Sequence, residues 1–94
     1  MAVVYIIYSS SIDKFYVGSC NDLVSRLEEH RNHKYSVGFT RRASDWQLFF
    51  KIENLEYQKA RKIEQHIKSM KSRRYYDNLK KYPEISKALI VKYN

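Results

Sequence analysis

The alternation of hydrophobic and polar positions along the chain predicts three strands. Residues 2–8 (AVVYIIY) form an unbroken β-branched and aromatic run, whose length suits a central strand that is buried on both faces. A polar connection separates this run from residues 15–18, which are expected to return beside it as the second strand of a hairpin. Residues 46–52 place apolar side chains at every second position and predict a third strand.

A helix and a polar loop are expected between the second and third strands. Asn21 is a favourable N-cap for a helix over residues 22–31. Leu23 and Leu27 would form the buried stripe of this helix. Residues 31–44 are polar and basic and contain a glycine, so they are expected to form a mobile loop.

Helical spacing dominates the rest of the chain. Asn54 is expected to cap a second helix. The apolar positions of this helix follow a 3-4-3 spacing, which is typical of a core-facing stripe: Ala60, Ile63, Ile67 and Met70. Residues 71–81 are basic, aromatic and predicted to be helical, and Pro83 suits the first position of a final helix. The positions of this last helix that are expected to face inward are Ile85, Ala88 and Leu89.

The resulting order, β-β-α-β-α-α-α, predicts an α+β fold with a small three-stranded antiparallel sheet flanked by helices. A chain of 94 residues has room for one hydrophobic core of modest size, so residues 1–94 are expected to form a single domain.

The charge of the chain points to a polyanionic partner. Eighteen Lys and Arg against ten Asp and Glu give a net charge of +8, and such side chains release condensed counterions when they approach phosphates. A surface that is basic without a partner is the alternative, but for so small a chain we favour nucleic acid. An acidic membrane surface is disfavoured, because no predicted helix pairs a wide apolar face with a purely basic one.

The single cysteine, Cys20, excludes an intramolecular disulfide and a multi-cysteine zinc site, and it fits a reducing compartment. It is expected to be a small packed thiol. No apolar run is long enough to span a bilayer, and residues 2–8 lack the basic leader and cleavage site of a signal peptide. We therefore expect a cytoplasmic protein without a membrane partner.

Arg26 and His30 are the first candidates for chemistry. Their i, i+4 spacing places them on one face of the first predicted helix, which we expect to border the sheet edge without being buried in it. Phosphodiester cleavage needs a positioned nucleophile, a cation for the developing negative charge and usually a metal. A guanidinium can bind phosphate oxygens bidentately. The alternative for Arg26 is a solvated charge paired with Asp22 or Glu29.

Glu64 is a candidate metal ligand. It lies beside the apolar stripe of the second helix, and a single carboxylate completed by waters and substrate phosphates is a common way to hold Mg²⁺. The alternative is an i, i+4 salt bridge to Lys68.

Tyr5 and Tyr16 lie on the first two predicted strands. A tyrosine titrates near pH ~10 and is a poor base unless cations lower its pKa. Without such cations, strand tyrosines mostly serve packing. Gly18 either lets a phosphate approach the backbone closely or only makes a turn.

Further basic residues are candidate substrate contacts. The polar loop contributes Lys34, Arg41 and Arg42, because loops beside a rigid sheet commonly carry function. Lys68 and Lys71 open a basic stretch that continues into Tyr75 and Tyr76. Such a mixture can hold phosphates and stack exposed bases, or it can be a solvated face with tyrosines packed inward. The stretch consists of Lys68, Lys71, Arg73, Arg74, Tyr75 and Tyr76.

The arrangement VVY…YVG…R…H…E resembles the GIY-YIG nuclease superfamily, specifically its small single-domain, UvrC N-terminal-like members. The segment FYVGSCNDLVSRLEEH looks like the second motif of that family running into its first helix, and ARKIEQHIKSMKSRR looks like its later glutamate-bearing helix. The resemblance covers nearly the whole chain. It implies the GIY-YIG fold and a metal-dependent endonuclease that acts on DNA, with DNA repair as the associated process.

The resemblance also implies roles for individual residues. It assigns Tyr5 to the tyrosine of the first motif, and Tyr16 and Gly18 to the tyrosine and glycine of the second. Arg26 matches the helix arginine, His30 the histidine-or-tyrosine position after it, and Glu64 the metal-binding glutamate. The implied reaction is an in-line attack on a phosphodiester. One tyrosine activates water with help from His30, Arg26 steadies the phosphate, and Glu64 holds one divalent cation, Mg²⁺ or Mn²⁺.

Two departures from the family pattern keep alternatives open. The first motif reads Val3-Val4-Tyr5, with its glycine and isoleucine replaced; valine suits a strand but leaves open how closely substrate approaches. From the sequence we expect no second DNA-binding domain, which predicts weak selectivity unless a partner protein supplies it. A non-catalytic nucleic-acid-binding module and a protein-interaction domain are the competing interpretations, and RNA remains open beside DNA as a substrate.

Overall fold

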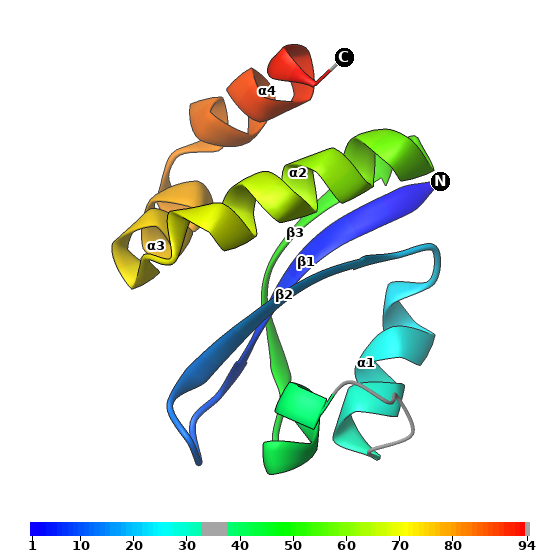
Figure 1. Ribbon diagram of the computed structural model, residues 1–94, viewed down its shortest axis with the longest axis vertical. Coiled ribbons are helices and arrows are strands. Elements are labelled where there is room, and N and C mark those ends of the chain that lie inside the picture. Colours follow the sequence, from blue (N-terminus) through cyan, green and yellow to red (C-terminus); the bar gives the residue numbers. More distant parts are fainter. Residues whose placement is uncertain (33–37, 94) are drawn as a thin grey trace.

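Three strands and four α-helices make up the part of the chain that the computed structural model describes, residues 1–32 and 38–93 (Figure 1). The strands are β1 Ala2–Ser9, β2 Lys14–Cys20 and β3 Gln47–Leu55. The α-helices are α1 Leu23–Arg31, α2 Tyr57–Met70, α3 Arg73–Lys81 and α4 Pro83–Lys92, and a 3-10 helix, η1 Gly38–Arg42, precedes β3. The predicted α+β class and element order are confirmed.

The sheet is antiparallel with β1 at its centre and β2 and β3 at its edges. Every residue of β1 except Tyr8 is buried, as its unbroken apolar run predicts. The register opposes Tyr5 to Gly18 and Ile7 to Tyr16. Because directly opposed residues share a face, these four positions belong to one side of the sheet.

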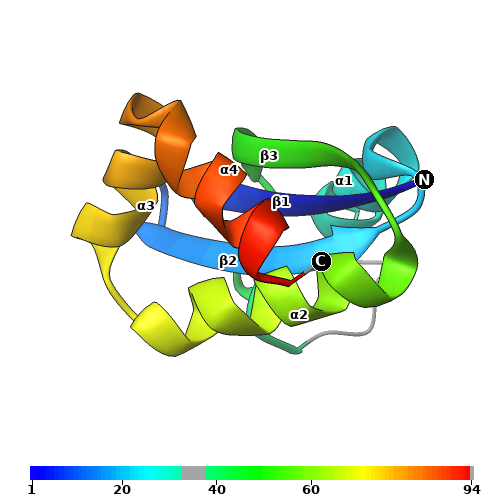
Figure 2. The ribbon, with the colours of Figure 1, turned by 90° about the horizontal axis from the view of Figure 1, so that it is seen from above.

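Each face of the sheet carries its own hydrophobic cluster. Val4 and Ile6 of β1 belong to the larger cluster, which also takes in buried residues of α2, α3 and α4. Tyr5 and Ile7 belong to the smaller cluster, which includes Trp46 and is flanked by side chains of α1. Figures 1 and 2 show the three C-terminal helices gathered together, apart from α1. Because successive side chains of β1 point to opposite faces of the sheet, they contribute to two separate hydrophobic cores.

Both predicted N-caps are wrong by one or two positions. Asp22, not Asn21, caps α1, and its carboxylate accepts a hydrogen bond from the backbone N–H of Ser25. The reason is that β2 runs on to Cys20, so Asn21 is used in the turn. Asn54 remains within β3 with a φ of 60°, a conformation that asparagine tolerates, and Glu56 is the N-cap of α2.

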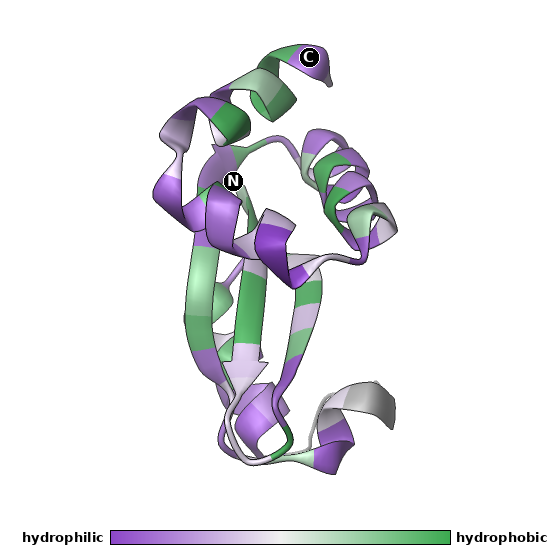
Figure 3. Cartoon of the chain, turned by 90° about the vertical axis from the view of Figure 1, so that its left-hand side faces the viewer, coloured by the Kyte–Doolittle hydropathy of each residue, from purple (hydrophilic) through white to green (hydrophobic). Residues whose placement is uncertain are grey.

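The buried stripes are confirmed in part. Ala60, Ile63 and Ile67 are buried, but Met70 is 43% exposed because α2 ends there and Lys71 turns the chain in a left-handed conformation. In α4, the inward positions are taken by Ile85, Leu89 and Ile90, and Ala88 is exposed. Figure 3 shows how hydrophobic residues concentrate on the strands while much of the helical surface is hydrophilic.

The predicted loop over residues 31–44 contains structure that its composition did not indicate. η1 occupies Gly38–Arg42, Thr40 and Ala43 are buried, and the indole N–H of Trp46 donates to the carbonyl of Thr40 at 2.9 Å. The prediction for residues 33–37 lies outside the described residues. Among the helices that the structure describes, none combines the length and the apolar character that crossing a membrane requires.

Candidate active site

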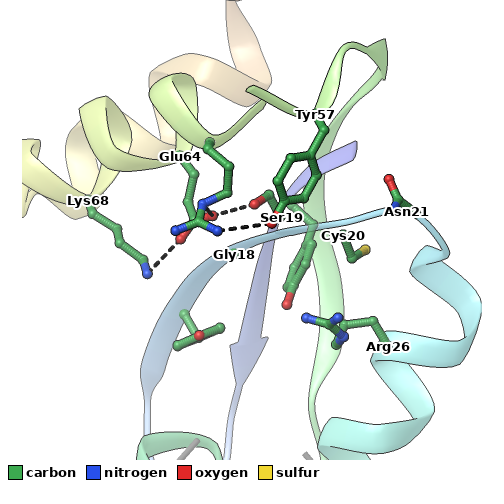
Figure 4. A pocket seen from close by; sticks show the side chains of 11 residues that line it. Gly18, Ser19, Cys20, Asn21, Arg26, Tyr57, Glu64 and Lys68 are labelled. Carbon is green, nitrogen blue, oxygen red and sulfur yellow. Dashed lines mark hydrogen bonds and ion pairs between the residues drawn. The ribbon is translucent and has the colours of Figure 1, made fainter. Parts of the chain in front are cut away.

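A pocket of about 390 Å³ opens at the edge strand β2, between α1 and α2 (Figure 4). Most of the predicted site residues line it: Tyr5, Tyr16, Gly18, Arg26, Glu64 and Lys68. These residues come from β1, β2, α1 and α2, so the fold brings together positions spread over more than sixty residues of sequence.

The edge position of β2 explains how one pocket receives groups from both faces of the sheet. Tyr16 and Gly18 lie on the face that carries Tyr5 and α1. Ser19, the next residue, lies on the other face, where its hydroxyl donates to a carboxylate oxygen of Glu64 on α2. Because no strand continues the described sheet beyond β2, a ligand at this edge can contact α1 and α2 at once.

Gly18 is needed because the Tyr5 ring covers its backbone. A Cβ at this position would lie 2.5 Å from the Tyr5 hydroxyl oxygen and 2.6 Å from Cζ of the same ring. Contacts of that length do not occur in packed proteins, so the ring would have to shift. Tyr5 is only 1% exposed and has little room to do so. The glycine of the motif therefore serves to seat the phenol.

We predict that Gly18→Ala destabilises the protein by about 1–3 kcal/mol, the usual cost of overpacking a core. The added methyl group would displace the Tyr5 ring that fills this space. Urea unfolding measures the loss. In a Tyr5→Leu background the same glycine substitution should cost less, because the aromatic ring that it meets is gone. An equal loss in both backgrounds would show that the ring is not the source of the clash.

His30 lies behind Tyr5 instead of facing the pocket. Its side chain is fully buried, so the expectation that the Arg26 and His30 face stays unburied is wrong for His30. The Tyr5 hydroxyl and Nε2 of His30 are 2.9 Å apart and share a buried hydrogen bond. The physical reason is that α1 packs its last turn against the smaller cluster, where Tyr5 is the polar partner available.

Burial dominates the electrostatics of this pair. It raises the pKa of Tyr5 far above the usual tyrosine range; the nearby Tyr16 adds to the shift, while the charge of Arg26 and its hydrogen bond to the phenol oppose it. Burial and, secondarily, the charge of Arg26 lower the pKa of His30 to about 4. At neutral pH both side chains are therefore uncharged.

The depressed pKa of His30 predicts a pH-dependent stability. The unfolded chain binds a proton at this histidine below about pH 6.5 and the folded chain only below about pH 4. Stability should therefore fall as pH drops between these values, by up to about 1.4 kcal/mol per unit. Urea unfolding between pH 7.5 and 4.5 measures this slope.

His30→Gln isolates the contribution of His30. The variant should show a shallower slope, and the remainder belongs to His66, whose pKa burial also lowers. Asp45 does not titrate in the measured pH range, because hydrogen bonds from Ser9 and Ser11 lower the pKa of its carboxyl to about 2. A slope in His30→Gln as steep as in the wild type would exclude His30 as the source.

Arg26 enters the pocket from α1 with its side chain 24% exposed. Its guanidinium lies 4.0 Å from the carboxylate of Glu29, so the alternative pairing within the helix is present at the limit of contact. A pair at this distance contributes little. The hydrogen bond between Arg26 and the Tyr5 phenol holds the guanidinium at the pocket, where it can meet an anion.

Glu64 lies at the other side of the pocket with its side chain 12% exposed. Oε1 accepts a hydrogen bond from the Ser19 hydroxyl, and Oε2 lies 2.7 Å from Nζ of Lys68. The i, i+4 salt bridge that competed with the metal-ligand interpretation thus exists. It does not exclude that interpretation, because Lys68 is 44% exposed and can move away.

The donor set fits a hard cation such as Mg²⁺ and not a zinc site. Within residues 1–32 and 38–93, no group of three or more His, Cys, Asp or Glu side chains could hold a metal ion by itself. Glu64 offers a carboxylate with the Ser19 hydroxyl beside it. The pocket has room for several waters of about 30 Å³ each, and Mg²⁺ usually keeps such waters.

The other predicted substrate contacts lie away from this pocket. Arg41 and Arg42 are exposed on η1, and Lys71 is exposed at the end of α2; none of these three described residues lines the pocket. Lys34 lies outside the described residues. These four stay predictions. Tyr75 and Tyr76 are partly buried against the larger cluster, which favours packing over base stacking for them.

Sequence reasoning did not predict five residues that line the pocket as site residues: Ser19, Cys20, Asn21, Tyr57 and Arg61. The signal for two of them was present. Positions 57, 61, 64 and 68 follow a 4-3-4 spacing, which places them on one polar stripe of α2 next to the apolar stripe. Arg61 donates a hydrogen bond of 3.0 Å to the Tyr57 hydroxyl on this stripe.

Comparison with known proteins adds one match. The model of a family described as the GIY-YIG catalytic domain matches residues 1–77. The matched range contains every predicted site residue and all the residues that line the pocket. No curated protein and no solved structure matches the chain.

Proposed function

The chain belongs to the GIY-YIG family of nucleases, and from this premise we propose that it is an endonuclease that hydrolyses DNA phosphodiester bonds. One observation supports the proposal above others. Tyr5, Arg26 and Glu64 come from three different elements and line one pocket at an open sheet edge, and each residue type suits a separate need of the reaction.

Arg26 is proposed to bind the phosphate at the bond that is cleaved. Its guanidinium is always charged, lines the pocket and offers paired donors for phosphate oxygens. The net charge of +8 would draw the polyanion to the protein. Because Arg26 is held beside Tyr5, the phosphate and the group that handles the proton are expected to lie close together.

Tyr5 is proposed to handle the proton of the attacking water together with His30. A phenol with a raised pKa keeps its proton at neutral pH and cannot act as a base alone. The hydrogen bond to the uncharged His30 supplies an acceptor. As the Tyr5 oxygen takes a proton from water, its own proton can pass to Nε2 of His30.

Glu64 is proposed to hold one divalent cation, Mg²⁺ or Mn²⁺, with Ser19 fixing the orientation of the carboxylate. GIY-YIG nucleases generally use divalent metals. When bound, such a cation supplies positive charge for the developing negative charge on the phosphate oxygens.

A non-catalytic DNA-binding module is the second candidate. The contacts of Glu64 with Ser19 and Lys68 favour it, because in this arrangement both carboxylate oxygens are engaged. The replacement of the first motif's glycine and isoleucine by Val3 and Val4 also favours this candidate. Both candidates share DNA as a partner. We further propose that the protein acts in the cytoplasm in DNA repair and that a partner protein selects the target. RNA is proposed as a second substrate beside DNA.

Plasmid DNA separates the two candidates. We expect binding in EDTA that weakens steeply with salt, which is the mark of phosphate contacts, followed by strand cleavage when Mg²⁺ or Mn²⁺ is added. Salt-sensitive binding without cleavage in any metal would favour the module. Binding that salt does not affect would contradict both candidates and favour a protein-interaction domain.

A further inference from the structure

The two oxygens of the Glu64 carboxylate have partners of different kinds (Figure 4). Oε1 accepts a hydrogen bond from the hydroxyl of Ser19, which is fixed in β2, and lies 4.0 Å from Nε of Arg61. Oε2 pairs with the ammonium group of Lys68, which is four residues further along α2. One oxygen is thus anchored to the sheet, and the other is paired with a long side chain that reaches it through the pocket.

The pair between Lys68 and Glu64 can exchange. The Lys68 side chain is 44% exposed, and salt bridges of this kind on a helix surface are weak. Nζ of Lys68 also lies 5.4 Å from the centre of the Tyr16 ring, whose face attracts cations, so the ammonium group already has a second partner in the pocket. Tyr16 belongs to the same pocket, so Lys68 can leave Glu64 without leaving the site.

Oε2 cannot serve an ammonium group and a divalent cation together. Two like charges within a few ångströms of each other repel strongly at a site that is partly shielded from water. Lys68 must therefore leave Oε2 before that oxygen binds a cation. A DNA phosphate in the pocket would attract the same ammonium group.

We propose that Lys68 is a positioning residue that couples cation binding to DNA binding. It neutralises Glu64 while the pocket holds neither ligand, and it turns to the DNA backbone when Glu64 takes a divalent cation. This inference rests on the proposed function. DNA and the cation each favour the departure of Lys68 from Glu64, so each should increase the affinity for the other, and by the same factor.

Mn²⁺ binding by the folded protein tests this inference without measuring cleavage. Free Mn²⁺ is followed by electron paramagnetic resonance, alone and with a short duplex of phosphorothioate DNA. We expect Lys68→Met to bind Mn²⁺ about fivefold more tightly than the wild type when DNA is absent, a change at the low end of site-to-site coupling. In the wild type, DNA should raise Mn²⁺ affinity by a larger factor than in Lys68→Met. Lys68→Arg, which keeps the charge, should restore most of that factor.

Lys62→Met is the matched control, because it removes the same charge from an exposed position of α2 that does not line this pocket. It should leave Mn²⁺ affinity and the coupling factor unchanged. Equal Mn²⁺ affinity in Lys68→Met and Lys62→Met would overturn the role proposed for Lys68. In that case the proposed function would still stand if Glu64→Gln no longer bound Mn²⁺. Failure of the wild type itself to bind Mn²⁺ would overturn both.

Discussion

Replacing Glu64 by glutamine is expected to lower metal-dependent DNA cleavage by at least about 100-fold. Loss of a group that only supports a metal ligand already costs about 10- to 100-fold, and Glu64 is proposed to be the ligand itself. Glutamine keeps the size of the side chain and an oxygen that can accept the Ser19 hydrogen bond. The fold and most DNA binding should therefore persist. Cleavage of plasmid DNA in Mg²⁺ measures the effect.

Glu84→Gln serves as the control for this prediction. Glu84 is an exposed carboxylate in the first turn of α4 and does not line the pocket among the described residues. Its replacement changes the net charge by the same amount and should leave cleavage within about twofold of the wild type. If Glu64→Gln cleaves as fast as Glu84→Gln, Glu64 does not hold the cation.

The second large effect is expected for Tyr5→Phe, which should lower cleavage by about 10²- to 10⁴-fold, the range for losing a general acid–base group. The variant removes only the hydroxyl that bonds to Nε2 of His30. Metal and DNA binding should change little, because Arg26 and Glu64 stay in place. Single-turnover cleavage with saturating protein separates the chemical step from binding.

Comparison with Tyr16→Phe decides which tyrosine handles the proton. Tyr16 lines the same pocket, and the centre of its ring lies 5.3 Å from that of His30. The Tyr5 hydroxyl, by contrast, is hydrogen-bonded to Nε2 of His30 at 2.9 Å. Tyr5→Phe should therefore be the slower variant by at least about tenfold. The opposite order would assign the proton to Tyr16 and leave Tyr5 as a buried support.

The fold was largely predictable because its strands and helices follow simple hydrophobic periods. The run at residues 2–8 is the central strand, and the stripe of Ala60, Ile63 and Ile67 is the buried face of α2. Where the prediction failed, the outcome depends on neighbours that a local pattern does not contain. η1 is held by the hydrogen bond between the Trp46 indole and the Thr40 carbonyl. In α4, Ile90 packs against the larger cluster in place of the predicted Ala88.

Six of the residues that line the candidate site were named from the sequence, but its geometry was not predictable. The spacing of Arg26 and His30 placed both on one helical face, yet only Arg26 reaches the pocket, since His30 is needed as the buried partner of Tyr5. The role of Gly18 also depends on a contact across strands, where the Tyr5 ring lies over its backbone. Such contacts follow from strand register, which residue spacing alone does not fix.

The central claim is that the pocket at the edge of β2 cleaves DNA, and Arg26→Ala tests it most directly. Plasmid cleavage in Mg²⁺ would be compared among the wild type, Arg26→Ala and Lys87→Ala, an exposed lysine of α4 outside the pocket. We expect cleavage by the wild type and Lys87→Ala that EDTA abolishes, and a loss of about 100-fold or more in Arg26→Ala, because the charge that steadies the phosphate is gone. Cleavage by Arg26→Ala at the wild-type rate would place the reaction elsewhere, and no cleavage by any of the three would contradict the nuclease proposal.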